Sequence, residues 1–298
     1  MSESTTSIAL KRVAPRRRRR GGGLRALWRS PIFLIAIAII TVVVLMAIFP
    51  GLFTQIDPRS CDLTKSRVGP EPGHLMGFDI QGCDYWSNIV HGARTSLEVG
   101  VLTALLTFIV ALIAGSLAGY FGGIVDTAIS WLSNMILGIP SMIASLVILY
   151  QFRDRTVWTI VLVLVLFGWA GTMRYMRSSV LQVKNLEYIQ AARGLGVGKW
   201  TILLRHVIPN SVTPLVVMST LSIGAGMAAE SGFSILGVGL RLPAISWGIQ
   251  IALAGQDGNW QIAPLLMLFP AAMLGLTTLA FVVLGESLRD ALDPKARR

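Results

Sequence analysis

Six stretches of this chain contain no Asp, Glu, Lys or Arg, and each is 18 to 24 residues long. A hydrocarbon layer of about 30 Å is crossed by roughly 20 helical residues. The backbone has no water to bond there, so each stretch is expected to form a helix. The sequence therefore predicts an all-α polytopic membrane protein with six transmembrane helices. The six runs are Ile32–Phe49, Val99–Tyr120, Thr127–Tyr150, Thr156–Met173, Ser211–Ala229 and Ile262–Gly285.

Composition excludes several other classes of protein. The chain is 53% hydrophobic and 14% charged, whereas soluble domains are about 25% charged. These values argue against a disordered chain, a disulfide miniprotein and an ordinary soluble enzyme. A membrane barrel would show alternating segments of about 10 residues, and we find none. The first run exceeds a typical signal-peptide core and no small-residue cleavage site follows it, so a retained span is expected in place of a cleaved signal. Pro140, Pro264 and Pro270 predict local kinks.

The positive charges predict the orientation in the membrane. With the N-terminus in the cytoplasm, the inner segments hold 19 Lys and Arg residues and the outer segments hold 7. Both termini are therefore expected inside. The net charge of +11 is concentrated in the N-terminal tail, which excludes a uniformly basic nucleic-acid-binding surface. Arg16–Arg20 are typical of a topology anchor on anionic lipid, with a nuclear signal or RNA-binding arm as the alternative.

These features divide the chain into a series of segments. We expect a basic cytoplasmic tail, a first span, an extracytoplasmic loop, a five-helix core and a cytoplasmic C-terminal tail. The core includes two long connections, and connections of that length tend to be functional or disordered. The boundaries are 1–30 for the tail, 31–49 for the first span, 50–98 for the loop, 99–285 for the core with its inner segment 181–210 and outer segment 232–261, and 286–298 for the C-terminal tail.

The inner segment has the pattern of two short helices. Apolar and polar residues are interleaved at helical spacing before and after three glycines, Gly194, Gly196 and Gly198. The glycines permit a sharp turn, and Pro209 is expected to stop the second helix. Spacing alone leaves two interpretations open: a surface for a partner protein, or an amphipathic helix resting on lipid.

Specific residues in this segment resemble a known signature. Gln190-Ala191-Ala192, then Gly196, then Ile208-Pro209 resemble the EAA motif of ABC-importer permeases, with Gln190 in place of the motif's Glu. The resemblance implies that this segment is a coupling helix that contacts an ATPase subunit. The residues it implicates are Glu187, Gln190, Ala191, Ala192, Gly196, Lys199, Arg205 and Pro209.

Three further blocks narrow the resemblance to the dipeptide/oligopeptide/nickel branch, of DppC/OppC type. The first has Cys83 where the family usually has Arg. With the EAA-like string, the blocks follow the family's order over most of residues 74–294. They are His74–Asp84 with His91–Leu97, Ala229–Gly239 with Pro243 and Ser246–Gly248, and Leu284–Pro294.

The resemblance implies a type I ABC importer permease with the MetI-like fold, in the bacterial inner (plasma) membrane. Its expected partners are a second, homologous permease subunit, two ATPase subunits and an extracytoplasmic substrate-binding protein. ATP and Mg would be bound by the partners, and no cofactor is expected in this chain. The expected substrates are dipeptides and oligopeptides, with a nickel chelate or a haem-like ligand as alternatives.

Catalytic chemistry is not expected of this chain. It has no Gly-rich loop with GK[ST], and its three histidines lack zinc-ligand spacing. An intramembrane protease would need Asp or Ser–His groups in its spans, yet the six runs contain no Asp, Glu or His. A secondary transporter or scaffold is the rival class, but we detect neither inverted repeats nor midplane charges.

Four other residues are candidates for specific roles. Glu98 and Glu230 lie near span ends, where a gate role competes with simple snorkelling or a wet vestibule. Cys61 and Cys83 are the chain's two cysteines, and both fall in the predicted outer loop. Oxidation is permitted outside the cell, so a disulfide is expected, with free thiols as the alternative.

Overall fold

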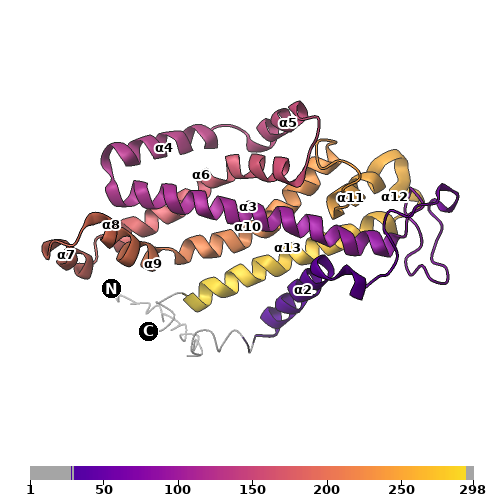
Figure 1. Ribbon diagram of the computed structural model, residues 1–298, viewed down its shortest axis with the longest axis horizontal. Coiled ribbons are helices and arrows are strands. Elements are labelled where there is room, and N and C mark those ends of the chain that lie inside the picture. The colour runs from indigo at the N-terminus through magenta and orange to yellow at the C-terminus, as the bar shows by residue number, and fades with distance from the viewer. Residues whose placement is uncertain (1–27, 29, 293–298) are drawn as a thin grey trace, which may run out of the picture.

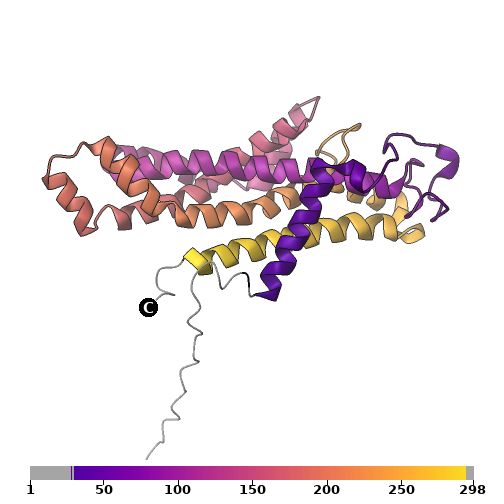
Figure 2. The ribbon, with the colours of Figure 1, turned by 60° about the horizontal axis from the view of Figure 1, so that its bottom comes forward.

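The computed structural model describes residue 28 and residues 30–292. Five of its helices are long and apolar enough to cross a membrane. In Figure 1, α3, α6, α10 and α13 run along the long axis of the molecule, and Figure 2 shows α2 crossing α13. The five are α2 (Pro31–Ile48), α3 (Tyr85–Phe121), α6 (Val157–Val183), α10 (Thr213–Ile235) and α13 (Leu265–Leu292).

The third apolar run is bent at the position where Pro140 predicts a kink. It forms two helices, α4 (Gly123–Leu137) and α5 (Ser141–Gln151), whose axes are bent by 82° at the break. Pro140 lies in the break, where it lacks an N–H group and disfavours helical geometry at the preceding residue. Residues 30–292 therefore hold five continuous candidate spans, and six if the bent pair is one span.

The second helix begins 14 residues before its charge-free run, so the loop 50–98 is shorter than expected. α3 starts at Tyr85, where the Asp84 carboxylate accepts a hydrogen bond from the Ser87 N–H. Glu98 directly precedes the charge-free run and Arg94 lies one turn earlier, but both are exposed on the helix while Ser96 and Leu97 between them are buried. An exposed charge on one face does not interrupt a helix whose other face is buried.

Close packing of small residues holds the long helices together. A Cβ at Gly115 or Gly119 of α3 would lie 2.7 to 3.0 Å from atoms of α6. Gly100 of α3 meets Ile223 and Met227 of α10, and Gly224 of α10 meets Thr278 of α13. The pattern Gly115-x-x-x-Gly119, which is common by chance, is here a helix contact.

The short elements gather at the two ends of the molecule (Figure 1). One end carries α7 (Glu187–Gly194), α8 (Lys199–Ile202), a π-helical turn (Leu203–Val207) and α9 (Ile208–Ser211). The other end carries the loop after α2, with 3-10 turns at Pro50–Leu52 and Leu63–Lys65, and α11 (Trp247–Gly255), a 3-10 turn at Gln256–Gly258 and α12 (Asn259–Ile262). The inner segment 181–210, which the charge count assigns to the cytoplasmic side, thus lies at one end of the molecule. The loop after α2 and the outer segment 232–261, which the charge count assigns to the other side, lie together at the opposite end.

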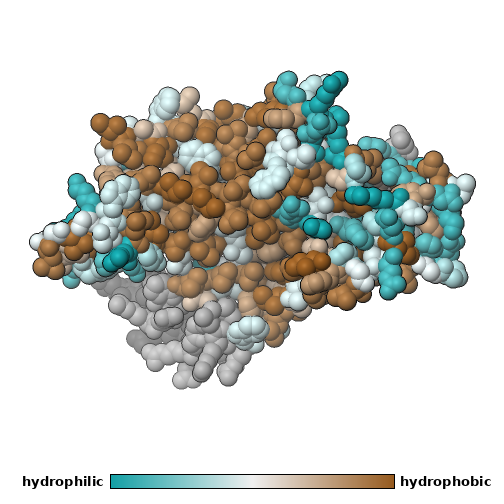
Figure 3. Space-filling model, in the orientation of Figure 1, coloured by the Kyte–Doolittle hydropathy of each residue, from teal (hydrophilic) through white to brown (hydrophobic). Residues whose placement is uncertain are grey.

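The surface agrees with a membrane position. Figure 3 shows hydrophobic residues over the middle of the visible face and hydrophilic residues gathered at the end formed by the loop after α2. Large apolar side chains are exposed on several helices, among them Trp131 of α4, Ile143 of α5 and Leu162 of α6. Such exposure suits lipid or a protein partner and not water.

Candidate functional site

The candidate coupling segment forms the helix, turn and helix that its sequence predicts. α7 ends at Gly194, and Gly196 in the turn has φ of 79°. The carbonyls of Ala191 and Ala192 accept hydrogen bonds from the Leu195 and Val197 N–H groups. The turn therefore uses the backbone of the Ala-Ala pair and a left-handed conformation that favours glycine.

Pro209 does not stop the second helix, in contrast to the expectation. The chain passes from α8 through the π-helical turn into α9 and then into α10. Pro209 has no N–H to donate, and the wider π turn directly before it accommodates the missing bond. The candidate coupling segment is thus continued by the membrane helix α10.

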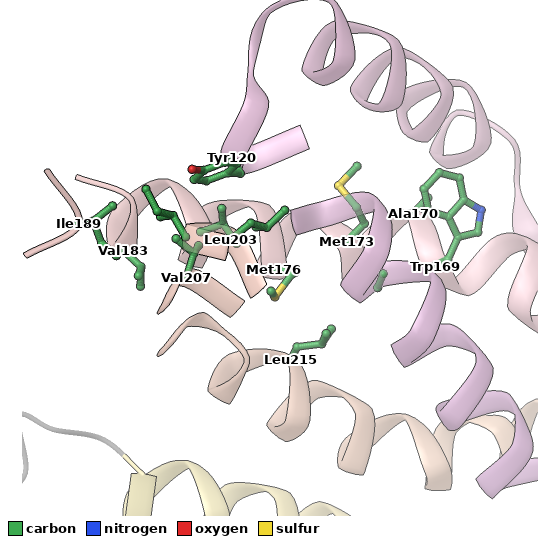
Figure 4. Close-up of a cluster of buried hydrophobic side chains, with 13 residues drawn as sticks. Tyr120, Trp169, Ala170, Met173, Met176, Val183, Ile189, Leu203, Val207 and Leu215 are labelled. Carbon is green, nitrogen blue, oxygen red and sulfur yellow. The ribbon is translucent and has the colours of Figure 1, made fainter. Parts of the chain in front are cut away.

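Buried side chains attach the segment to the membrane helices. Ile189 of α7 and Leu203 and Val207 of the π turn are at most 1% exposed, and they share one core cluster with Tyr120 and Val183 (Figure 4). A shared core of this kind resists deformation, because cavities and overpacking both cost free energy. The segment and the ends of α3 and α6 therefore form one packed unit.

Polar and aromatic contacts reinforce this attachment. Lys184 Nζ donates to the Gly119 carbonyl at 2.6 Å, the Arg193 guanidinium lies 5.5 Å from the centre of the Tyr120 ring, and the rings of Phe121 and Trp200 meet at 5.1 Å. Sequence reasoning missed these α3 partners, although an aromatic pair directly before Gly122-Gly123 marks the position.

The outward face of the segment combines apolar and polar groups. Leu195, Trp200 and Leu204 are 59 to 84% exposed. The Gln190 side chain donates to the Asn185 carbonyl at 3.1 Å, a bond that the carboxylate of the usual Glu does not make. Of the residues implicated by the motif, Ala192 is half-buried and the rest are exposed: Glu187, Gln190, Ala191, Gly196, Lys199, Arg205 and Pro209.

The other end of the molecule is organised around Glu230, which sequence placed among the gate or vestibule candidates. Its carboxylate is fully buried, and Oε1 accepts hydrogen bonds from the hydroxyls of Ser234 and Ser246, each at 2.9 Å. The Ser246 hydroxyl also accepts the Ile249 N–H, which caps α11. Gly248 leaves room for the carboxylate, since a Cβ there would lie 2.6 Å from Oε2. Glu98, by contrast, is exposed on α3.

Trp247 fixes α11 against α3. Its side chain is fully buried, its indole N–H donates to the Ile89 carbonyl at 2.9 Å, and its backbone N–H donates to the Ser96 hydroxyl at 3.0 Å. Gly92 of α3 allows this approach, since a Cβ there would lie 3.0 Å from the indole. The three blocks of sequence at residues 91–97, 229–239 and 246–248 therefore meet in one packing unit.

The loop after α2 is held by covalent and polar bonds. Cys61 and Cys83 form the expected disulfide. His74 Nδ1 lies 2.7 Å from the buried Asp84 carboxylate. Burial raises the pKa of the Asp79 carboxyl above its usual value, although backbone N–H groups, Cys83 foremost, oppose the shift. The loop also reaches α3, because the Trp86 indole donates to the Phe53 carbonyl at 2.9 Å.

We expect mass spectrometry of the alkylated, non-reduced protein to recover the Cys61 and Cys83 peptides as one linked species. The bond closes a separation of 22 residues, which stabilises the fold by about 3 kcal/mol in the chain-entropy model. A Cys61→Ser, Cys83→Ser double variant, which leaves no unpaired thiol, is the control. Alkylation of both thiols in the native protein without reductant would contradict the bond.

Comparison with known proteins identifies the family. Residues 111–298 match the family described as binding-protein-dependent transport system inner membrane component. The chain belongs to this family. It is therefore a permease subunit of an ABC importer and a multi-pass membrane protein.

Several curated relatives of this permease cover most of its length. It is 37% identical over 240 residues to the dipeptide transport system permease protein DppC of Bacillus subtilis (strain 168). The matched region covers 79% of this chain and 73% of the relative. It is 33% identical over 241 residues to the oligopeptide transport system permease protein OppC of Mycobacterium tuberculosis (strain ATCC 25618 / H37Rv), with 79% and 81% covered.

Solved structures show the same fold. The permease superposes on a chain of the MetNI methionine ABC transporter in an inward-facing conformation, with a TM-score of 0.53 and 17% identity, covering 67% of this chain and 95% of that chain. A chain of an amino acid ABC transporter gives a TM-score of 0.52 at 15% identity, with 68% and 92% covered. The MetI-like fold implied by the resemblance is confirmed.

Metal-binding chemistry finds no support in the described part of the permease. Residue 28 and residues 30–292 contain no cluster of three or more His, Cys, Asp or Glu side chains that could hold a metal ion. His74 pairs with Asp84, and His91 Nδ1 lies 2.9 Å from the Ser87 carbonyl oxygen.

Proposed function

We propose that this permease is a transmembrane subunit of an ATP-driven importer of dipeptides and oligopeptides, in which it forms half of the translocation path. The observation that carries the proposal is the similarity to peptide permeases over about four-fifths of the chain. A relative named for glutathione transport is 34% identical over 79% of this chain, and glutathione is also a short peptide. The common chemistry favours a peptide over a nickel chelate or a haem-like ligand.

We infer that Gln190–Pro209 contacts an ATPase subunit. The segment lies at one end of the molecule (Figure 1). Its outer face exposes apolar and basic residues, while its inner face shares a core with α3 and α6. Transmission of movement requires a rigid body and no catalytic group. The packed core and the continuity with α10 supply that rigidity.

We propose the orientation of the assembly from the charge pattern, and its partners from the family to which the chain belongs. Positive charges favour both termini, the tail 1–30 and the coupling segment in the cytoplasm. The disulfide-linked loop 50–84 and α11–α12 then lie on the outer side of the membrane. A substrate-binding protein docks on that side. A second homologous permease completes the translocation path, and two ATPase subunits bind ATP and Mg.

We expect the permease purified without partners to hydrolyse no ATP, because its sequence has no phosphate-cradling GK[ST] loop. Co-expressed with the ATPase subunits and the second permease, it should purify as a complex with ATPase activity. Phosphate release per mole of protein is the measurement, and a Walker-lysine variant of the ATPase subunit is the control. ATP hydrolysis by the partner-free permease, or failure to retain an ATPase subunit, would contradict the proposal.

A further inference from the structure

A pocket of about 380 Å³ lies between the end of α3 and the proposed coupling segment. This volume is within the range of small-molecule sites, about 300 to 1,000 Å³. Its lining comes from α3, from α7 with the turn that follows it, and from α8. The lining residues are Tyr120, Phe121, Arg193, Val197, Lys199 and Ile202.

The pocket lining carries positive charge and no negative charge. Arg193 and Lys199 are both exposed, and no Asp or Glu side chain is part of the lining. A pocket with this charge suits an anion. Neither cation is neutralised by a carboxylate within residues 30–292, where the ion pairs are Lys65–Glu71, His74–Asp84 and Arg177–Asp126.

A third cation lies close to the pocket. The Arg193 guanidinium is held over the ring of the buried Tyr120, 5.5 Å from its centre. Burial lowers the pKa of the Lys184 amine, and the positive charge of Arg193 lowers it further. Asp126 opposes this shift, but its two oxygens are bonded to Arg177. Like charges repel each other at such sites, and a bound anion would relieve the repulsion.

The pocket lies where two membrane helices end. α3 ends at Phe121 and α4 begins at Gly123, and both helices belong to candidate spans. The Phe121 ring meets that of Trp200, and aromatic residues gather at the interface between bilayer and water. Ile124 at the start of α4 is 88% exposed. An apolar surface for an acyl chain therefore adjoins the cationic pocket.

We propose that this pocket binds the headgroup phosphate of an anionic phospholipid. The phosphate lies between Arg193 and Lys199, because guanidinium and ammonium groups both bind phosphate oxygens. An acyl chain of the same lipid lies along the exposed apolar start of α4. The bound phosphate bridges α7 and α8 and fastens them to α3.

The proposal rests on the orientation proposed above, which places the pocket at the cytoplasmic leaflet. Basic pockets beside membrane helices on that side bind anionic headgroups. A lipid in the pocket is compatible with the proposed ATPase contact, since the exposed Leu195 and Leu204 do not line the pocket.

Lipid binding by the purified, full-length permease tests the site. Native mass spectrometry in a neutral detergent measures the Kd for phosphatidylglycerol. We expect Arg193→Gln and Lys199→Gln each to raise this Kd about tenfold, and Arg205→Gln to leave it within about twofold of the wild-type value. Arg205 is an exposed arginine of the same segment that does not line the pocket. An equal loss of binding in all three variants would overturn the proposal. The measurement involves no transport, so its outcome is independent of the imported substrate.

Thermal unfolding separates a lipid from a free phosphate. We expect phosphatidylglycerol at about ten times its Kd to raise the melting temperature of the wild type and of Arg205→Gln by about 3 °C. Arg193→Gln should show no rise, and phosphatidylcholine or inorganic phosphate should have no effect on any of them. The same rise with inorganic phosphate would mean that a free anion occupies the pocket. A full rise in Arg193→Gln would mean that the lipid binds elsewhere. Either result would overturn the proposal.

Thiol protection locates the occupant. Both native cysteines form the disulfide, so Val197→Cys introduces one free thiol in the pocket lining. In nanodiscs we expect phosphatidylglycerol to slow its alkylation about fivefold relative to phosphatidylcholine. Leu195→Cys, at an exposed position outside the lining, is the control and should react equally in both lipids. Equal rates for Val197→Cys in the two lipids would overturn the proposal. Protection by the ATPase subunit in phosphatidylcholine, without an effect of phosphatidylglycerol, would assign the pocket to an acidic side chain of that partner and would overturn it as well.

Discussion

Gly196→Val is expected to lower ATP-driven peptide import by about tenfold or more while the complex still assembles. The φ of Gly196 is 79°, and a β-branched residue is a strong outlier in that region. No atom lies within 4 Å of a Cβ at this position, so the effect comes from the backbone and not from a clash. Valine would force the turn to open and displace the surface between α7 and α8.

A substitution series separates this cause from side-chain bulk. Gly196→Asn should retain more import than Gly196→Ala, because asparagine tolerates the left-handed region. Gly171→Val is the control, since Gly171 lies on α6 outside the proposed contact segment, has no positive φ and has nothing within 4 Å of its Cβ. Uptake and ATP hydrolysis are measured on the same purified complexes. Normal import by Gly196→Val would reject the coupling role of this turn.

Replacing both Gly115 and Gly119 with valine is expected to disrupt the bundle itself. A Cβ at Gly115 would lie 2.7 Å from the Met173 carbonyl oxygen, and one at Gly119 would lie 2.9 Å from the Arg177 carbonyl oxygen. Backbone atoms of α6 cannot move aside without separating the helices. Overpacking of this kind costs about 1 to 3 kcal/mol per site, so we expect the double variant to lose most of its folded population.

Thermal unfolding in detergent, followed by size-exclusion chromatography of the heated protein, measures this effect. Gly171→Val on α6 is the control, because its Cβ meets nothing within 4 Å. A melting temperature of the double variant equal to that of the control would show that α3 and α6 do not depend on this close approach.

The charge-free runs located the long helices because a charged side chain is expensive in the bilayer interior. The same criterion misplaced the start of α3, since Arg94 and Glu98 precede the charge-free run but lie on an exposed face of the helix. Pro140 marked the break in the third run, yet sequence could not supply the 82° angle. That angle depends on how α4 and α5 pack against α6.

The motif residues of the proposed coupling segment can be recognised in the sequence, whereas the residues that pack against them cannot. The residue type of Gly196 predicts a turn. The contacts of Tyr120 and Lys184 are not predictable in this way, because they join residues about 70 positions apart along the chain. Pro209 was expected to end a helix, and the π turn before it allows the helix to continue. The burial of Glu230 likewise depends on Ser246 and Gly248, which reach it only through the fold.

Uptake of labelled dialanine into proteoliposomes that contain the complete transporter tests the central claim most directly. The account predicts accumulation only when ATP is present on the side of the ATPase subunits, the substrate-binding protein is present on the opposite side, and this permease is in the complex. Dialanine uptake driven by an ion gradient without ATP, or undiminished in a complex that lacks this chain, would contradict it.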